Sequence, residues 1–474
     1  MRSQSPSDET AAPPPAVSAT LSAADKPGAK RWQTGTLTYS AGGLALLFLW
    51  LLWGDFGYYL KERSVPPTLQ MLLKQYQVSD MVIGLLIVSL PQAITIGLAP
   101  VMSYYSDRHR GRWGRRIPFL FVPTPIAFCS MIGLAFSPDL GRWLHQAVQI
   151  TRWTENITIV IVFACFWTVF ELCTITCNSA FFGLINDVVP QAIISRFFAM
   201  FRVFSLGAGM LFNFYLFGNA ETHYAAIFIG IGALYFFSFS LMCFKVKEGQ
   251  YPPPPPRPAQ RAGGAFDAIR TYFRDCFSNS YYVWIFLSFA FVWMATTPFN
   301  LFYIYFAKTV KMDMATLGKY ATLQLFLSLL QAYPVGWLAD KFHPLRVTIA
   351  GLCLYLTSSL LAFFLVRDAA TFGFFFVFYG TITGFWLTAS QPIGSKLFPK
   401  LKFASFDGAR IACYSLGMMI SGPLCGYLLD LFGNPYRYIY LWAAGFSFLA
   451  LICTVIVYRR FKAYGGLQNY VPPE

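Results

Sequence analysis

Three ionisable side chains fall inside long apolar runs of the sequence: Asp55, Glu171 and Arg202. A charge at the centre of a bilayer costs about 2.5–3.5 kcal/mol on insertion scales, so each is first a functional candidate. Glu171 lies close to the centre of its run. At 1.5 Å per helical residue, Arg202 lies ~6 Å inward of its centre and Asp55 lies ~6 Å outward of its own. These positions indicate charge chemistry within a membrane.

Glu171 and Arg202 are expected at similar depth on consecutive helices, which favours an ion pair between them. A guanidinium beside a carboxylate alters how tightly that carboxylate holds a proton, so a solute that engages the guanidinium changes proton binding. We therefore predict a Glu171–Arg202 pair facing a cavity, with Asp55 or Glu171 as the protonation site. The alternatives are a static structural ion pair and, for Asp55, a position near the outer headgroups.

Amide and aromatic side chains also occur at depth in the apolar runs. Amides bond the hydroxyls of a polar solute, and rings cover its apolar face. The predicted solute-binding residues are Trp53, Gln92, Asn178, Asn300, Gln324, Trp386 and Gln391. Each of them is also compatible with a hydrogen bond between helices.

The composition requires lipid as the solvent for much of the chain. Of its 474 residues, 56% are hydrophobic and only 12% are charged, whereas soluble proteins carry about a quarter charged residues. The net charge of +15 comes from Lys and Arg that lie between the apolar runs. That placement fits the positive-inside rule of membrane topology and argues against a nucleic-acid partner.

Twelve apolar runs approach the ~20 residues needed to cross a bilayer core of ~30 Å. They lie near 40–61, 81–105, 117–137, 157–183, 196–218, 222–244, 283–307, 317–338, 347–366, 371–395, 408–430 and 436–458. The long polar gap between the sixth and seventh runs contains five consecutive prolines, which favour an extended spacer. The sequence therefore predicts an all-α membrane protein with twelve transmembrane helices in two sets of six.

The predicted organisation has five parts. They are a disordered cytoplasmic tail (1–38), a six-helix bundle (39–244), a proline-rich cytoplasmic linker (245–282), a second six-helix bundle (283–458) and a cytoplasmic tail (459–474). Lys and Arg concentrate in the loops on the side of the two tails. This bias predicts that both termini are cytoplasmic. We also expect the protein to lie in the cell (inner or plasma) membrane.

The two halves resemble each other in sequence. Segment 103–108 follows the second run and segment 336–341 follows the eighth; each reads small residue, three residues, Asp, base. The acids of the two segments are Asp107 and Asp340. Duplicated six-helix halves are a transporter architecture, with the binding site between the halves near the membrane midplane.

The segment Ser103-x-x-x-Asp107-Arg108-x-Arg-Gly-Arg-Trp-Gly-Arg115-Arg116-x-Pro-Phe resembles the loop-2–3 motif of the major facilitator superfamily. More narrowly, it is similar to the form in glycoside–pentoside–hexuronide:cation symporters and plant-type sucrose transporters. A later run with Asn-Asp187-x-x-Pro and Arg196-Phe-Phe-Ala resembles their helix-4/5 junction.

The resemblance implies the major facilitator fold of two pseudo-symmetric bundles, in which helices 1, 4, 7 and 10 line a cavity. It also implies alternating access, with gating contacts near the membrane surface. The predicted gating residues are Asp107, Arg108, Arg115, Arg116, Asp187, Arg196 and Asp340. The alternative is that the basic residues only fix the cytoplasmic edge of the bundle.

We expect a secondary active transporter that moves a small polar solute, a sugar or glycoside, in symport with protons. Sodium is less favoured, because Gln92 and Thr95 occupy the helix that carries paired Asp residues in the melibiose-type branch. The alternatives are a drug or lipophile exporter of the same fold and a non-transporting receptor or scaffold. The expected partners are the solute and lipid, and the expected oligomeric state is a monomer.

No enzymatic or metal chemistry is predicted. The four His residues lie in loops without metal spacing, and the ten Cys residues include no CxxC pair. No Walker motif or nucleophile elbow occurs in the sequence. The prediction is therefore a non-enzyme without a cofactor, with a proton as the coupling ion.

Overall fold

The computed structural model describes residues 31–148, 153–250, 274, 276–399 and 402–473. Residues 1–30 of the predicted tail and most of the predicted linker lie outside this part. Within it, eleven helices are long and apolar enough to cross a membrane. A further helix, α11, has 29 residues but a more polar sequence.

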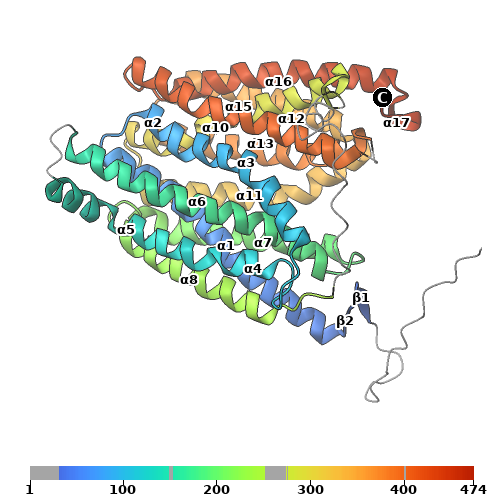
Figure 1. Cartoon of the computed structure of the whole chain (residues 1–474). Helices are drawn as coiled ribbons and strands as arrows, with labels where there is room; N and C mark the ends of the chain where they lie inside the picture. The colour runs from blue at the N-terminus through green and yellow to red at the C-terminus, as the bar shows by residue number, and fades with distance from the viewer. Residues whose placement is uncertain (1–30, 149–152, 251–273, 275, 400–401, 474) are drawn as a thin grey trace, which may run out of the picture.

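The first half of the chain forms a hairpin and six spanning units (Figure 1). The elements are β1 (Trp32–Thr34), β2 (Leu37–Tyr39), α1 (Ala41–Gln75), α2 (Asp80–Gly84) continued by η1 (Leu85–Ser89) and α3 (Leu90–Arg108), α4 (Ile117–Phe121) continued by α5 (Pro123–Ala147), α6 (Glu155–Val188), α7 (Ile194–Leu211) continued by η2 (Phe212–Leu216) and η3 (Phe217–Asn219), and α8 (Tyr224–Lys245).

The second half forms six more spanning units and a short final helix. The elements are α10 (Ser280–Thr309), α11 (Met314–Phe342), α12 (Pro344–Leu365), α13 (Ala369–Ser390) followed by α14 (Ile393–Leu397), α15 (Phe403–Leu431), α16 (Tyr438–Ala463) and α17 (Gly466–Asn469).

The helices pack in the same pattern in both halves. In the first half α1 packs on α7 and α8, α5 packs on α6 and α8, and α3 packs on α6. In the second half α10 packs on α15 and α16, α12 packs on α13 and α16, and α11 packs on α13. These pairs correspond one to one in chain order, which confirms the predicted arrangement of two pseudo-symmetric six-helix bundles.

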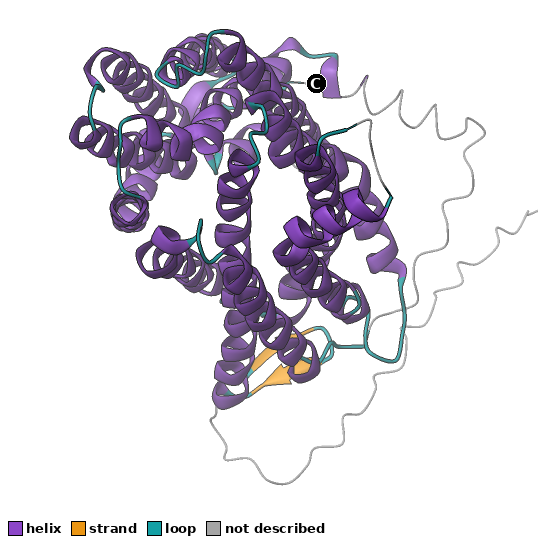
Figure 2. Cartoon of the chain, turned by 90° about the vertical axis from the view of Figure 1, so that its left-hand side faces the viewer, coloured by secondary structure: helices purple, strands orange, loops and turns teal. Residues whose placement is uncertain are grey.

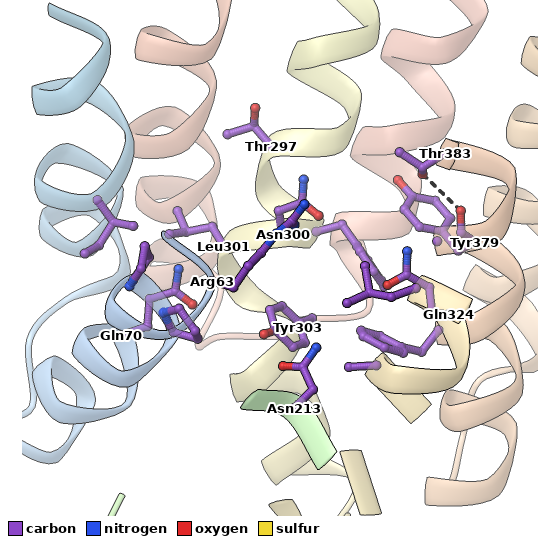
Figure 3. Close-up of a pocket in the computed structure, with 18 of the residues that line it drawn as sticks. Arg63, Gln70, Asn213, Thr297, Asn300, Leu301, Tyr303, Gln324, Tyr379 and Thr383 are labelled. Atoms are coloured by element: carbon purple, nitrogen blue, oxygen red, sulfur yellow. Dashed lines mark hydrogen bonds between the residues drawn. The ribbon is translucent and has the colours of Figure 1, made fainter. Parts of the chain in front are cut away.

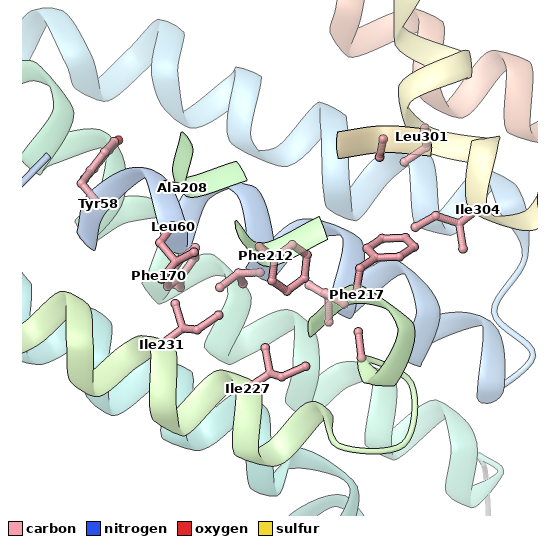
Figure 4. Close-up of a cluster of buried hydrophobic side chains, with 14 of the residues drawn as sticks. Tyr58, Leu60, Phe170, Ala208, Phe212, Phe217, Ile227, Ile231, Leu301 and Ile304 are labelled. Atoms are coloured by element: carbon pink, nitrogen blue, oxygen red, sulfur yellow. The ribbon is translucent and has the colours of Figure 1, made fainter. Parts of the chain in front are cut away.

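Both termini of the described chain lie at one end of the bundle (Figure 1). We call this the hairpin end, because it carries β1 and β2, and we call the opposite end, where α2 begins, the far end. Figure 2 views the molecule from the far end. Buried side chains pack between α1, α6 and α8, including Leu60, Phe170 and Ile231, and the cluster continues to Leu301 and Ile304 of α10 (Figure 4).

Two predictions about the first half need correction. α1 has 35 residues and ends at Gln75, whereas its apolar run was expected to end near residue 61. The helix continues because buried partners accommodate Lys61, and the apolar positions Leu69, Met71 and Leu72 beyond it are buried. Residues 32–38 of the predicted disordered tail, together with Tyr39, form the antiparallel β1–β2 hairpin.

Candidate functional site

A cavity of about 350 Å³ lies between the two halves (Figure 3). Helix α1, with η1 and η2, lines it from the first half, and α10, α11, α13 and α15 line it from the second. Its polar lining residues are Glu62, Arg63, Gln70, Asn213, Thr297, Asn300, Tyr303, Gln324, Tyr379 and Thr383. Ligand pockets span roughly 300–1,000 Å³, so this cavity suits a small solute that forms hydrogen bonds.

Two prolines change the chemistry of α1 where it borders the cavity. Pro66 and Pro67 lie inside α1 and line the cavity. Proline has no backbone N–H, so the carbonyls four residues earlier, on Glu62 and Arg63, lose their helical donors. Such carbonyls are tolerated at membrane depth where they face protein or a cavity. Pro66 and Pro67 therefore free two backbone carbonyls on residues that line the cavity.

Lys61 is fully buried next to Glu62. Its Nζ lies 3.0 Å from Oε1 of Glu62 and donates a hydrogen bond of 2.8 Å to Oγ1 of Thr174 on α6. The same Nζ lies 4.3 Å from the ring centroid of Tyr58. Glu171 lies between Phe170, whose ring centroid is 4.9 Å from the same Nζ, and Thr174, one helical turn further on, so its carboxyl group is close enough to Lys61 and Glu62 for their charges to affect it. One ammonium and two carboxylates therefore meet between α1 and α6, as the Lys61–Glu62–Glu171 cluster.

The predicted ion pair between Glu171 and Arg202 is wrong. Nη2 of Arg202 donates a hydrogen bond of 3.2 Å to Oγ1 of Thr388 on α13, and no ion pair joins it to Glu171 within the described residues. Instead, Lys61, in a segment expected to end the helix, lies beside Glu171: its Nζ donates to Thr174 and lies 4.9 Å from the ring centroid of Phe170. The similar depth of Glu171 and Arg202 stays a prediction.

Asp55 is fully buried in α1, so it does not lie at the protein surface near lipid headgroups. Among the described groups, neither of its carboxylate oxygens has a hydrogen-bond partner. A buried carboxylate without partners is costly unless it is protonated. This geometry suits a group that binds a proton.

Two of the predicted solute-binding residues, Asn300 and Gln324, line the cavity. Five others lie outside its lining: Trp53, Gln92, Asn178, Trp386 and Gln391. Trp386 is buried, and its ring packs 5.8 Å from that of Phe289. Contact with a solute at those five positions stays a prediction.

The sequence reasoning missed the cavity residues of α1, above all Arg63 and Gln70. A signal for them was present. Apolar residues resume after Pro67, as Thr-Leu-Gln-Met-Leu-Leu, without the turn residues that would end a helix. This pattern predicts that the charges at 61–63 lie within a longer membrane helix.

At the hairpin end, several predicted gating residues form a network in the first half. Arg116 places Nη2 2.5 Å from Oδ1 of Asp107 and Nε 2.9 Å from Oδ2 of Asp187. Arg115 lies 2.5 Å from the same Asp187 oxygen. The carboxylate of Glu248, just after α8, accepts hydrogen bonds of 2.7–2.8 Å from three successive backbone N–H groups at the start of α4. These contacts tie α3, α4, α6 and α8 together.

The second half repeats this network in simpler form. Asp340 lies 3.5 Å from Nζ of Lys396, and Lys396 precedes a proline by three residues, as Asp187 does. A base thus replaces the acid and pairs with Asp340 directly. Arg108 lies 5.1 Å from the ring centroid of Tyr104, and Arg196 is exposed. The ion pairs described here each stay within one half, and a gating role for these residues stays a prediction.

At the far end, hydrogen bonds join the halves. Asp430 of α15 accepts bonds of 3.0 Å from the backbone N–H groups of Asp80 and Met81, at the start of α2. A carboxylate at a helix N-terminus is stabilised by the helix dipole. The Asp80 carboxylate lies 2.6 Å from Nζ of Lys74 and accepts a 2.8 Å bond from the Tyr436 hydroxyl.

Close helix packing and a second ion pair also close the far end. A Cβ added to Gly84 would lie 2.6 Å from the backbone carbon of Gly422, so α2 and α15 touch through their backbones. Glu221 lies 2.8 Å from Nζ of Lys308 across the halves. Burial would raise the pKa of Glu221, but hydrogen bonds from Lys308 and Gln75 outweigh burial and lower that pKa below its ordinary value.

Comparisons with known proteins agree with this architecture. The sequence profile of the family described as MFS/sugar transport protein matches residues 40–399. The structure is similar to that of a bacterial homolog of the human lysosomal transporter Spinster in an inward-facing, occupied conformation (TM-score 0.64, 14% identity, 91% of this chain and 98% of that chain).

Two further solved structures are similar. One is the nucleoside transporter NupG (TM-score 0.61, 13% identity, 87% of this chain and 99% of that chain). The other is a D-xylose-proton symporter (TM-score 0.61, 12% identity, 88% and 97%). No curated protein matches the sequence. The structural likenesses show the fold. The sequence profile spans most of the chain and shows that this protein belongs to the MFS/sugar transport protein family.

Proposed function

We propose that the protein is a secondary active transporter that moves a small polar solute, a sugar or glycoside, in symport with protons. The observation that carries the proposal is a polar cavity between the two halves with the Lys61–Glu62–Glu171 cluster at its edge. Amides, hydroxyls and the Tyr303 ring line that cavity, which are groups suited to a sugar. The D-xylose-proton symporter of the same fold supports the substrate class and the coupling ion.

The cluster supplies a physical route for coupling. Two carboxylates share one ammonium, so the cluster is electrically neutral when it holds one additional proton. Glu62 both pairs with Lys61 and lines the cavity. A solute that hydrogen-bonds to Glu62 therefore changes the electrostatic potential at Glu171, and with it the affinity of Glu171 for a proton. Asp55, buried without a partner among the described groups, is the second candidate proton carrier.

The conformation fits one step of alternating access. Direct contacts close the far end, whereas the ion pairs at the hairpin end stay within their own halves. With both termini in the cytoplasm, as the positive-inside rule indicates, this is the inward-facing form of a monomeric transporter. The Asp107 and Asp340 networks then lie where the halves meet when the inner side closes.

The size and lining of the cavity favour a small polar solute over a bulky lipophile. A volume of about 350 Å³ is at the lower end of ligand pockets, and hydrogen-bonding groups left unmatched by a lipophile would be costly. The exporter alternative is therefore the weaker reading.

Reconstitution in liposomes tests the proposal. A panel of sugars is offered with and without an imposed pH gradient, and the expected result is accumulation of one sugar only with the gradient. Glu171→Gln should abolish uphill uptake and keep exchange of solute across the membrane. Glu155→Gln changes an exposed acid at the start of the same helix and serves as the control.

The outcomes separate the parts of the proposal. Unchanged uphill uptake by Glu171→Gln removes the coupling role of that residue. A panel in which no sugar moves removes the substrate class but leaves the fold standing.

A further inference from the structure

Arg63 places a guanidinium at the cavity (Figure 3). The residue lies on α1 and is exposed to the open space that the cavity provides. Throughout the described part of the chain, its side chain has no ion pair and no hydrogen bond within reach. A cation at membrane depth is costly unless it pairs with another group or faces water in a cavity, and Arg63 faces the cavity without a partner among the described residues.

The charge balance of the cavity makes this more specific. Glu62 and Arg63 are its two charged lining residues in the described structure. The carboxylate of Glu62 already faces Lys61 at 3.0 Å, and that ammonium is fully buried. When Glu171 holds the coupling proton, Lys61 balances the negative charge of Glu62 at the cavity, and the positive charge of Arg63 is left without a counterpart among these residues. An anion that arrives with the solute would balance it.

The stem of Arg63 packs beside α7. A Cβ added to Gly209 of that helix would lie 3.4 Å from Cγ and 3.6 Å from Cδ of Arg63, which are ordinary contact distances. The planar guanidinium at its end binds two oxygens of a carboxylate or phosphate at once.

Groups for the rest of the solute lie close by. Asn300 and Tyr303 of α10 and Gln324 of α11 line the same cavity as Arg63 (Figure 3). Their amides and hydroxyl match sugar hydroxyls rather than a second charge. We infer that the transported solute is anionic: it carries a carboxylate or phosphate group that Arg63 holds, beside hydroxyls that the amides bind. This inference rests on the proposed transport through the cavity.

Binding of three matched hexose probes to the full-length protein tests the inference. The probes are methyl β-D-glucoside, which is neutral, D-glucuronate, which has a carboxylate, and D-glucose 6-phosphate. Affinity is measured from the shift of the melting temperature and the quenching of tryptophan fluorescence, and uptake is measured in liposomes. At least one charged probe should bind more tightly than the neutral glucoside, and the tighter of the two identifies the anionic group.

The variants separate charge from fold. Loss of a charge-assisted hydrogen bond weakens binding on the order of 10- to 100-fold. Arg63→Gln should therefore lower the affinity for the charged probe by that factor. The affinity for the neutral glucoside should fall by much less than that factor. Arg63→Lys keeps the charge but not the planar fork, and it should give an intermediate affinity. Arg346→Gln is the matched control. Arg346, at the start of α12, lies outside the cavity and donates a hydrogen bond to the hydroxyl of Tyr458 on α16.

Four results decide the matter. Preferred binding and uptake of the neutral glucoside overturn the inference and leave the proposed function intact. If Arg63→Gln loses affinity for the charged and the neutral probes equally, the inference is also overturned. It is overturned as well if the wild-type protein binds neither charged probe. Arg63-dependent binding and uptake of a charged probe that needs no pH gradient supports the inference and removes proton symport from the proposed function.

Discussion

Replacing Asp430 with alanine should open the far end. Its carboxylate accepts two hydrogen bonds of 3.0 Å from the start of α2, in the other half of the molecule. Loss of a hydrogen bond to a charged group costs about 1.5–3 kcal/mol. Because water can bond to part of the exposed backbone, losing both bonds costs about 2–4 kcal/mol of stability of the closed state. A factor of ten per 1.4 kcal/mol makes the ratio of closed to open molecules fall by about 30- to 700-fold.

Spin labels on either side of the far end provide the assay. Thr222, before α8, and Arg367, before α13, are both exposed and belong to different halves. Labels attached through non-natural amino acids leave the ten native cysteines in place. In Asp430→Ala, the distance distribution measured by pulsed electron resonance should gain a longer component at the expense of the wild-type one.

Asp313→Ala is the matched control for this measurement. Asp313 also caps a helix at the far end, since its carboxylate accepts a 3.0 Å bond from the N–H of Thr316, but that bond lies within one half. It should cost stability without changing the distance. If folded Asp430→Ala keeps the wild-type distribution, the bonds from Asp430 do not hold the far end closed, and the reasoning fails.

Two further predictions use the same labels. Gly84→Ala should lengthen the distance, because its Cβ would lie 2.6 Å from the Gly422 backbone, whereas Gly97→Ala, with no atom within 4 Å, should not; equal behaviour of the two variants would contradict close packing as the cause. The pKa of Glu221 is lowered by its pairing with Lys308. The stabilisation of the closed end by this pair is therefore complete at any pH above the ordinary glutamate pKa, and it is lost only as the pH falls through the lowered pKa. The distance should therefore stay constant from neutral to mildly acidic pH and lengthen in stronger acid, and Glu221→Gln should remove that acid step; lengthening that begins near neutral pH would exclude Glu221 as its source.

Much of the fold follows from the sequence because a bilayer sets the length of each apolar run. Two sets of six runs and the repeated segments around Asp107 and Asp340 predicted the two related bundles. The length of α1 did not follow, since a rule based on apolar runs ends a helix at its first cluster of charges. Lys61 is accommodated by a buried hydroxyl and aromatic rings, which a one-dimensional pattern does not contain.

The candidate site was predicted only in part for a related reason. Position along a run fixes the depth of a residue, and that was enough to select Asn300 and Gln324. The partner of a residue depends also on rotation about the helix axis, which the sequence leaves open. Glu171 therefore lies beside Lys61 rather than Arg202, although all three residues belong to membrane-spanning helices.

The most direct test of the account is whether protons enter with the solute. Liposomes that hold a pH-sensitive dye receive, on the outside, the sugar that the uptake panel identifies. The account predicts that the interior acidifies on addition of sugar with the wild-type protein, and that Glu171→Gln exchanges labelled sugar without acidification. Sugar entry through the wild-type protein with no change of internal pH would contradict proton symport.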